Sequence, residues 1–222
     1  MSPGRPSPSD DSLAPRARTF EQARARATYE ALLDSARDVF SRHGFDDAQT
    51  PDIARAAKVS VGTFYRYFRD KRQIFVEMIA SHLAAVHEQV AEQITLEKFH
   101  GDRRRVIEQA LDLLCAHVRQ HPALHRVYLS MSLRDHEVAA LRRSFERKGE
   151  ALIAHLIEAI APPGAILDAR AAAHVIVVAT LEITFSRAGL RMPSGSESTI
   201  AVRDDLLRWA LGEMIHRFVF PA

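Results

Sequence analysis

The chain has 222 residues, 47% of them apolar, which is enough for a real core in one large or two modest domains. Its net charge of only +2 argues against a non-specific polycation, and its single cysteine, Cys115, excludes an intramolecular disulfide and fits a reducing cytoplasm. The N-terminus is too polar for a secretory signal, and no run reaches the roughly 18 apolar residues of a membrane span.

Residues 1–18 are rich in proline, serine and arginine, a composition typical of disordered segments. We expect them to form a basic arm. Arg16, Arg18, Arg24 and Arg26 could reach DNA phosphates or a minor groove, although a solvated tail is as consistent with the sequence. Apolar residues at helical spacing from Tyr29 onwards predict the first helix, and we expect Gly44 to end it.

Two short helices joined by a tight turn are predicted between residues 50 and 68. Thr50 is expected to cap the first of them and Ser60 the second. Lys58 lies in the turn, where a left-handed backbone would cost on the order of 1 kcal/mol for a non-glycine residue. Asp70 is expected to cap the helix that follows.

The second short helix buries Phe64 and Phe68 at a spacing of four, so its other side chains must point away from the core. They are hydroxyls, aromatics and cations, which bind phosphates and base edges, and Arg66 could reach a guanine. Gly62 permits a close backbone approach to a ligand. An ordinary pair of core helices explains the two phenylalanines but not this alternation, so the pattern favours a helix-turn-helix that reads a major groove.

Charge is distributed unevenly along the chain. Residues 16–72 hold 12 lysines and arginines against 8 aspartates and glutamates, whereas residues 73–222 hold 17 against 18. The basic excess falls on the predicted helix-turn-helix, where phosphate contacts dominate affinity. An excess of this size is also common in solvated domains and alone proves little.

The rest of the chain is predicted to be helical, at residues 71–96, 103–120, from 122 onwards, 136–160, 168–187 and 199–218. The helix at 168–187 is apolar nearly all round and should be buried on every side. One face would then lie in the core and the other against a second subunit. We predict that the last two helices of each subunit form a four-helix interface, the alternative being that this helix is central to its own domain.

No catalytic arrangement is visible in the sequence. His117, His121 and His125 are spaced by four, but Pro122 interrupts their helix and no cysteine or carboxylate completes a metal site. Neither a nucleophile elbow nor a phosphate-binding loop occurs. Cys115 lies in an apolar helical run and is interpreted as core. We therefore expect no metal, no cofactor and no enzymatic activity.

The chain resembles the TetR family of transcriptional regulators in the stretch Ile53-Ala54-x-x-Ala57-x-Val59-Ser60-x-Gly62-Thr63-Phe64-Tyr65-x-Tyr67-Phe68-x-x-Lys71. The resemblance covers about the first third of the chain. It implies an all-α homodimer with a disordered arm at 1–18, a helix-turn-helix DNA-binding domain at 19–70 and a helical ligand-binding and dimerisation domain at 71–222. Together with the chemistry of the exposed groups, it implies DNA contacts from Thr50, Lys58, Ser60, Val61, Gly62, Thr63, Tyr65, Arg66, Tyr67 and Lys71.

Two positions depart from the common pattern of that family. Lys58 stands in the turn where many members have glycine, and it adds a cation near the phosphates. Val61 stands where many members have a polar side chain that reads bases, and it could contact a thymine methyl. The sequence therefore does not name an operator.

The same resemblance implies a small-molecule effector, and the apolar composition of residues 71–222 favours a hydrophobic one. Candidate lining residues, each also well explained as core, are Tyr128, Met131, Phe145, His174 and Phe185. The expected function is a cytoplasmic, ligand-responsive repressor that binds palindromic double-stranded DNA as a dimer. The alternative is a helical architectural or partner-binding protein with non-specific DNA attachment.

Overall fold

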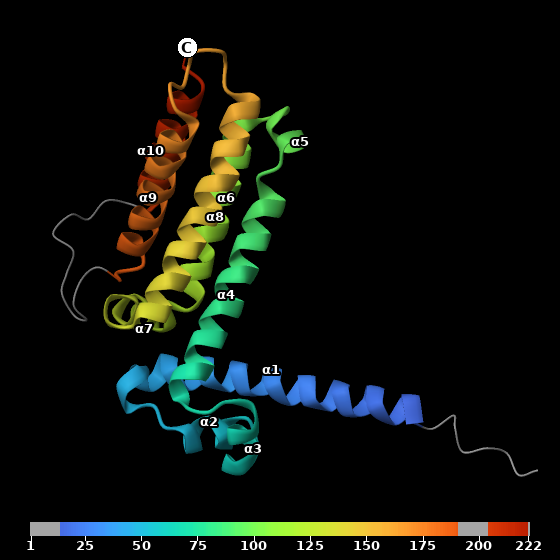
Figure 1. Ribbon diagram of the computed structural model, residues 1–222. Helices are drawn as coiled ribbons and strands as arrows, with labels where there is room; N and C mark the ends of the chain where they lie inside the picture. The colour runs from blue at the N-terminus through green and yellow to red at the C-terminus, as the bar shows by residue number, and fades with distance from the viewer. Residues whose placement is uncertain (1–13, 191–203, 222) are drawn as a thin grey trace, which may run out of the picture.

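The computed structural model describes residues 14–190 and 204–221, and within them it contains helices and no strand. The helices are α1 (Ala14–Asp47), α2 (Thr50–Ala56), α3 (Val61–Tyr67), α4 (Lys71–Gln93), α5 (Leu96–Phe99), α6 (Arg103–Gln120), α7 (Pro122–Arg134), α8 (His136–Ile160), α9 (Ala169–Arg187) and α10 (Asp204–Val219). A small head contains α1 to α3, and a taller body contains α5 to α10 (Figure 1). Helix α4 leaves the head and runs up through the body. The expected all-α fold is confirmed.

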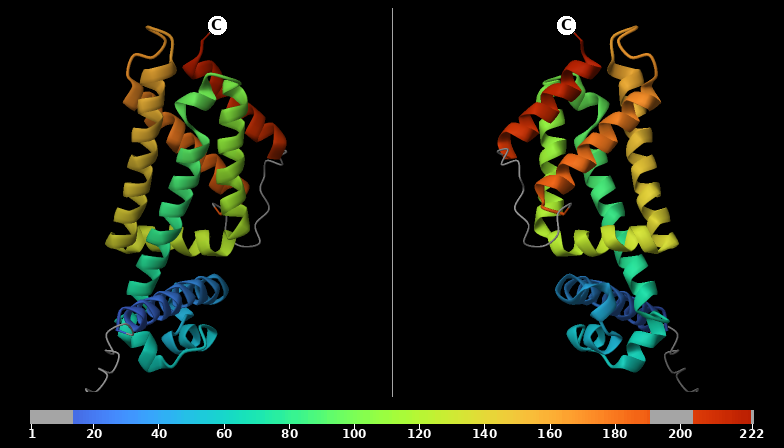
Figure 2. Two further views of the ribbon diagram at one scale, coloured as in Figure 1. Left: turned by 90° about the vertical axis from the view of Figure 1, so that its right-hand side faces the viewer. Right: turned by 90° about the vertical axis from the view of Figure 1, so that its left-hand side faces the viewer.

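Buried aromatic rings hold the head together. These rings include Phe40 on α1, Phe64 on α3, Phe68 at the C-cap of α3 and Phe75 on α4. Each of the four is at most 1% exposed. The rings of Phe40 and Phe75 meet edge to face with their centroids 5.0 Å apart. Buried side chains of α7 join this cluster, so the head packs on α7 as well as on α4. Both side views show α7 lying across the base of the body next to α1 (Figure 2).

Side-chain caps fix the starts of α3 and α4, as the sequence predicts. Ser60 accepts a hydrogen bond from the backbone N–H of Thr63 at 3.0 Å. Asp70 accepts one from the backbone N–H of Gln73 at 2.7 Å. Each cap satisfies an N–H that has no partner inside the helix, so both helices begin at defined residues.

Other boundaries in the head differ from the expectation. Helix α1 begins at Ala14, so residues 14–18 of the expected disordered arm are helical, while residues 1–13 lie outside the described residues. Gly44, with a φ of 73° and a ψ of −178°, is non-helical, so the regular part of α1 ends there as expected, and a short helical segment follows it to Asp47. Thr50 is the first residue of α2 and not its cap. Gln49 occupies the cap position in an extended conformation and makes no side-chain cap hydrogen bond.

The body follows the predicted ranges closely. Helices α6 and α8 have the expected bounds, because Asp102 and Asp135 cap their first turns. Helix α4 ends three residues earlier than predicted, and the short α5 follows it without a signal that sequence reasoning recognised. Helix α10 is described from Asp204, and residues 199–203 of its predicted range lie outside the described part of the chain.

Helix α9 is buried on one face only within a single chain. It packs against α8, α6 and α10, and Ala173 and Ile176 on the packed face are at most 6% exposed. Val175 and Val178, on the other face, are 53% and 44% exposed. Helix α10 also leaves large apolar side chains open, namely Leu206, Trp209, Met214 and Phe218. The expectation of burial on every side is therefore not met by one chain alone.

The same helix has the length and apolar composition of a membrane span. Residues 169–186 reach a mean hydropathy of 1.3 over 18 positions, although charged residues such as Arg170 and Glu182 interrupt the apolar run. This is weak evidence for a span, because the core helix of a globular bundle passes the same test. Its packing against three helices of the body accounts for the apolar residues of the packed face, and 33% of the 18 residues are buried in a single chain.

A group of ion pairs ties the start of α4 to the corner between α7 and α8. Arg72 donates from Nε and Nη2 to the two carboxylate oxygens of Asp135, at 2.6 and 2.9 Å, and from Nη1 to Glu137 at 2.8 Å. Asp135 also accepts hydrogen bonds from the backbone N–H groups of Glu137 and Val138. The hydrogen bonds from the Arg72 guanidinium lower the pKa of Asp135 from 3.8 to about 2. One carboxylate thus joins the head end of α4 to the body.

Substituting Asp135→Asn should flatten the dependence of stability on pH in acid. Because the folded pKa lies below the unfolded one, the stabilisation is complete above pH 3.8 and is lost as the pH falls to about 2. We expect the urea midpoint of the unsubstituted chain to fall more steeply over that interval than the midpoint of Asp135→Asn. Glu137→Gln, at a more exposed partner, should retain most of the slope. Equal slopes in all three proteins would contradict this assignment.

Candidate nucleic-acid interface and body cavities

A closed turn sets the direction of α3. Lys58 has a φ of 57°, the left-handed conformation expected there, and its N–H donates to the carbonyl of Arg55 at 3.0 Å. The N–H of Val59 donates to the carbonyl of Ala54, also at 3.0 Å. These bonds fix the angle between α2 and α3, which together lie at the end of the head remote from the body (Figure 1).

The outer side of α3 presents groups that suit contact with DNA. Val61 and Tyr65 are 39% and 53% exposed, and Gly62 and Arg66 are exposed as well. The hydroxyl of Tyr65 lies 3.2 Å from Oγ1 of Thr50. The first turn of α2 and the middle of α3 therefore share one polar edge, on which hydroxyls, a guanidinium and an apolar side chain lie together.

The fold itself does not require glycine at position 62. A Cβ there would meet only Oγ of Ser60, at 3.7 Å, which is an ordinary van der Waals distance. Glycine within a helix costs roughly 0.5–1 kcal/mol relative to alanine. What Gly62 supplies is a bare backbone in the first turn of α3, where N–H groups have no partner inside the helix.

Tyr67 and Lys71 are placed differently from the other predicted contacts. Tyr67 is half-buried, and its ring lies 6.5 Å from those of Tyr29 and Phe68. The ammonium group of Lys71 donates to the carbonyl oxygens of Asp46 and Ala48, at 2.7 and 3.1 Å. Lys71 thus holds the end of α1 and the residue that follows it against the start of α4, and we expect its effect on DNA binding to be largely indirect.

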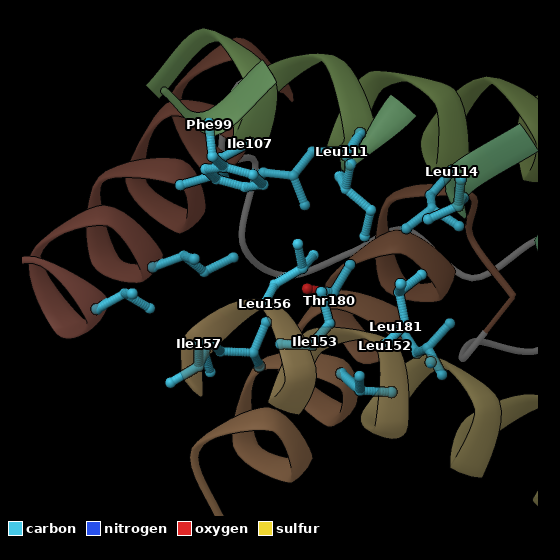
Figure 3. Close-up of a pocket in the computed structure, with 18 of the residues that line it drawn as sticks. Phe99, Ile107, Leu111, Leu114, Leu152, Ile153, Leu156, Ile157, Thr180 and Leu181 are labelled. Atoms are coloured by element: carbon cyan, nitrogen blue, oxygen red, sulfur yellow. The ribbon is translucent and has the colours of Figure 1, made fainter. Parts of the chain in front are cut away.

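A large apolar cavity of about 130 Å³ lies inside the body. Side chains from α4, α5, α6, α8, α9 and α10 line it, and none of them is acidic, lysine or arginine. Figure 3 shows aliphatic and aromatic side chains converging on this space, with the Thr180 hydroxyl as a polar atom among them. A cavity lined in this way holds water poorly and favours an apolar occupant.

A second cavity, of about 30 Å³, adjoins the first on the side of the head. Of the five candidate ligand residues, Tyr128, Phe145 and Phe185 line it, and Phe145 also lines the larger cavity. Met131 and His174 line neither. Met131 is part of the core between the head and α7, and the exposed ring of His174 is 2.8 Å from Glu150 on the outer side of α8 and α9.

Four histidines meet where α4 passes α6 and α7. The ring centroid of His82, on α4, lies 5.4, 6.3 and 5.3 Å from those of His117, His121 and His125. Desolvation lowers the pKa of His82 to about 3 and that of His125 to about 4, and the neighbouring histidines add to both shifts. Sequence reasoning singled out the three residues spaced by four but missed His82, which only the fold brings to them. No group of side chains suited to hold a metal ion occurs among the described residues.

The two short helices α2 and α3 and the turn between them place the protein in the helix-turn-helix class. The body is a separate helical domain with internal cavities. Residues 32–78 match the family model described as bacterial regulatory proteins, tetR family. This stretch of the chain therefore matches the N-terminal domain of the TetR family. This confirms the resemblance found in the sequence.

Known proteins similar to this chain agree with that assignment. The transcriptional repressor NemR of Escherichia coli is 32% identical over 94 residues, which are 40% of this chain and 46% of the repressor. The chain thus spans less than half the length of this curated relative. The family match and this relative support the interpretation that the matched part of the chain belongs to a DNA-binding transcriptional regulator.

Solved structures resemble the chain over most of its length. A TetR-family regulator from Mesorhizobium loti has a TM-score of 0.69 and 19% identity, and the match covers 88% of this chain and 96% of that one. The regulator FadR from Bacillus subtilis, solved in complex with stearoyl-CoA, has a TM-score of 0.61 and 16% identity over 86% and 97% of the two chains. At these identities the likeness shows the fold.

Proposed function

We propose that the protein is a cytoplasmic repressor that binds a palindromic operator as a homodimer and is released by a small-molecule effector. The observation that carries the proposal is the outward position of α3 on a head with a buried aromatic core. Its buried face is fixed by Phe64, while Tyr65 and Gly62 remain open. The ten contact residues named above stay a proposal, with Tyr67 and Lys71 acting mainly by holding the head.

A dimer supplies a second DNA-binding head. Two recognition helices must lie about 34–36 Å apart to enter successive major grooves of a palindrome. The open apolar faces of α9 and α10 are suited to a symmetric interface, since each would otherwise leave large apolar side chains in water. We propose the four-helix interface of α9 and α10 from both subunits as the contact that fixes this separation.

The effector would act through α4. His87 and Val90 of α4 and Ile94 at its C-cap line the large cavity, and the opposite end of the same helix is tied to the head. A ligand that fits only when α4 is displaced changes the separation of the two heads and so weakens DNA binding. By linkage, bound DNA weakens the binding of the ligand by the same factor. That FadR was solved with stearoyl-CoA supports a hydrophobic effector.

Selection of operator sequences from random duplex DNA tests the proposal. The purified protein should enrich a palindrome and prefer it to random duplex by at least about a thousandfold, a preference that survives physiological salt. Tyr65→Ala should weaken binding to that palindrome by about tenfold, whereas Leu133→Ala, at an exposed site on α7, should not change it. Equal affinity for all duplexes would favour the alternative of an architectural protein with non-specific DNA attachment.

A further inference from the structure

The two cavities of the body form one two-part space. Leu114, Phe145 and Leu181 line both, so the larger space and the smaller one meet at these side chains. The surface of both parts is mainly apolar, but the side chains that border the smaller part include the polar residues His125, Tyr128 and Thr184. A ligand that occupied both parts would need an apolar body and a polar end.

Polar atoms at the smaller cavity lack hydrogen-bonding partners. His125 is 5% exposed, and neither of its ring nitrogens has a partner among the described residues. Tyr128 is 4% exposed, and no described residue offers its hydroxyl a hydrogen bond. Buried polar groups are rarely left unsatisfied, and each costs stability until it is paired. Tyr128 and His125 are therefore open to an acceptor supplied by a ligand.

Charges at the smaller cavity are already balanced. Nε of Arg142 lies 2.9 Å from Oε1 of Glu146, so the guanidinium has a carboxylate partner. Burial holds the pKa of His125 far below neutral pH, so the imidazole is neutral and offers one donor and one acceptor. A carboxylate or ammonium placed here would lose its hydration without gaining a free counter-charge.

We infer that the effector is an uncharged amphiphile, with an apolar chain or ring system in the larger cavity and one carbonyl or hydroxyl group in the smaller cavity. That group accepts hydrogen bonds from the Tyr128 hydroxyl and the His125 ring. A volume of about 30 Å³ admits a group of only a few heavy atoms. This inference rests on the proposed function in one respect, which is that the bound molecule controls DNA binding.

A set of probes with the same chain and different end groups tests the ligand class. Calorimetric titration of the full-length protein near neutral pH would use dodecanamide, dodecanol, dodecanoate and dodecyltrimethylammonium, each below its micelle concentration. We expect the amide and the alcohol to bind at least about tenfold more tightly than the anion and the cation.

Two substitutions test the hydrogen bonds of the smaller cavity separately from the apolar contacts of the larger cavity. Tyr128→Phe should weaken dodecanamide binding by about tenfold, because the ring stays and only the hydroxyl is lost. Thr180→Val, the matched control, removes a hydroxyl from the larger cavity and should leave the ratio of amide to carboxylate affinity unchanged. Thermal unfolding of both variants checks that each remains folded.

Three results would overturn the ligand class: a charged probe that binds as tightly as the amide, an unchanged amide affinity in folded Tyr128→Phe, or no binding of any probe. Operator affinity is measured separately with and without dodecanamide. If the amide binds with the expected ranking but leaves operator affinity unchanged, the ligand class stands and the ligand-responsive part of the proposed function fails.

Discussion

Placing arginine at both Val175 and Val178 should convert the proposed dimer into a monomer and lower operator affinity by at least about a thousandfold. Both side chains are exposed on the open face of α9 and lie three residues apart, so they share one side of the helix. In a two-fold interface each substitution is repeated, so four guanidinium groups would be buried among apolar side chains without partners.

The loss of DNA binding follows from the loss of the second head. A single α3 contacts one half-site, and the energy of the other half-site is gained only when both heads are held at a fixed separation. The monomer should remain folded, because Val175 and Val178 point away from the packed face that carries Ala173 and Ile176.

Analytical ultracentrifugation and operator titration at micromolar protein would measure the two effects. Ser81→Arg with Ala84→Arg is the matched control, because these exposed residues are also three apart, on α4. The control should stay dimeric and bind the operator. A monomeric unsubstituted chain would overturn the proposed interface, and so would a dimeric Val175→Arg, Val178→Arg protein with normal operator affinity.

Much of the fold could be predicted because local signals decide it. The capping side chains of Ser60 and Asp70 and the spacing of apolar residues in α6 and α8 act within a few residues of the backbone they fix. Thr50 shows the limit of such reasoning. Its hydroxyl could form a hydrogen bond either with an N–H group of α2 or with the hydroxyl of Tyr65. The bond with Tyr65 forms because α2 packs on α3, which the local sequence does not indicate.

The site was less predictable where function depends on distant partners. Lys71 fits a phosphate contact in the sequence, but its ammonium group reaches carbonyls 23 and 25 residues earlier in the chain. His82 carries no local signal, and its importance comes from three rings on α6 and α7. Likewise, no pattern separates the residues that line a cavity from those that fill a core, so Met131 and Tyr128 look alike until the helices are packed.

The role of Gly62 can be separated from stability by two substitutions. Gly62→Ala should raise the free energy of unfolding by roughly 0.5–1 kcal/mol, because alanine is the better helix former and its Cβ has room beside Ser60. The same methyl group should hold the backbone of α3 away from DNA and weaken operator binding by about tenfold, in line with the loss of close contacts.

Gly62→Glu should weaken operator binding by more than about a hundredfold while leaving the fold intact. A carboxylate in the first turn is compatible with the positive end of the α3 dipole, so thermal stability should not fall. At the DNA surface the same charge would meet phosphates, and the salt dependence of binding would change with it. Ala84→Glu, at an exposed position on α4, matches the change in charge and should bind DNA normally. Normal operator affinity in Gly62→Glu would mean that the first turn of α3 does not approach DNA, and a large loss of stability would mean that the glycine serves the fold after all.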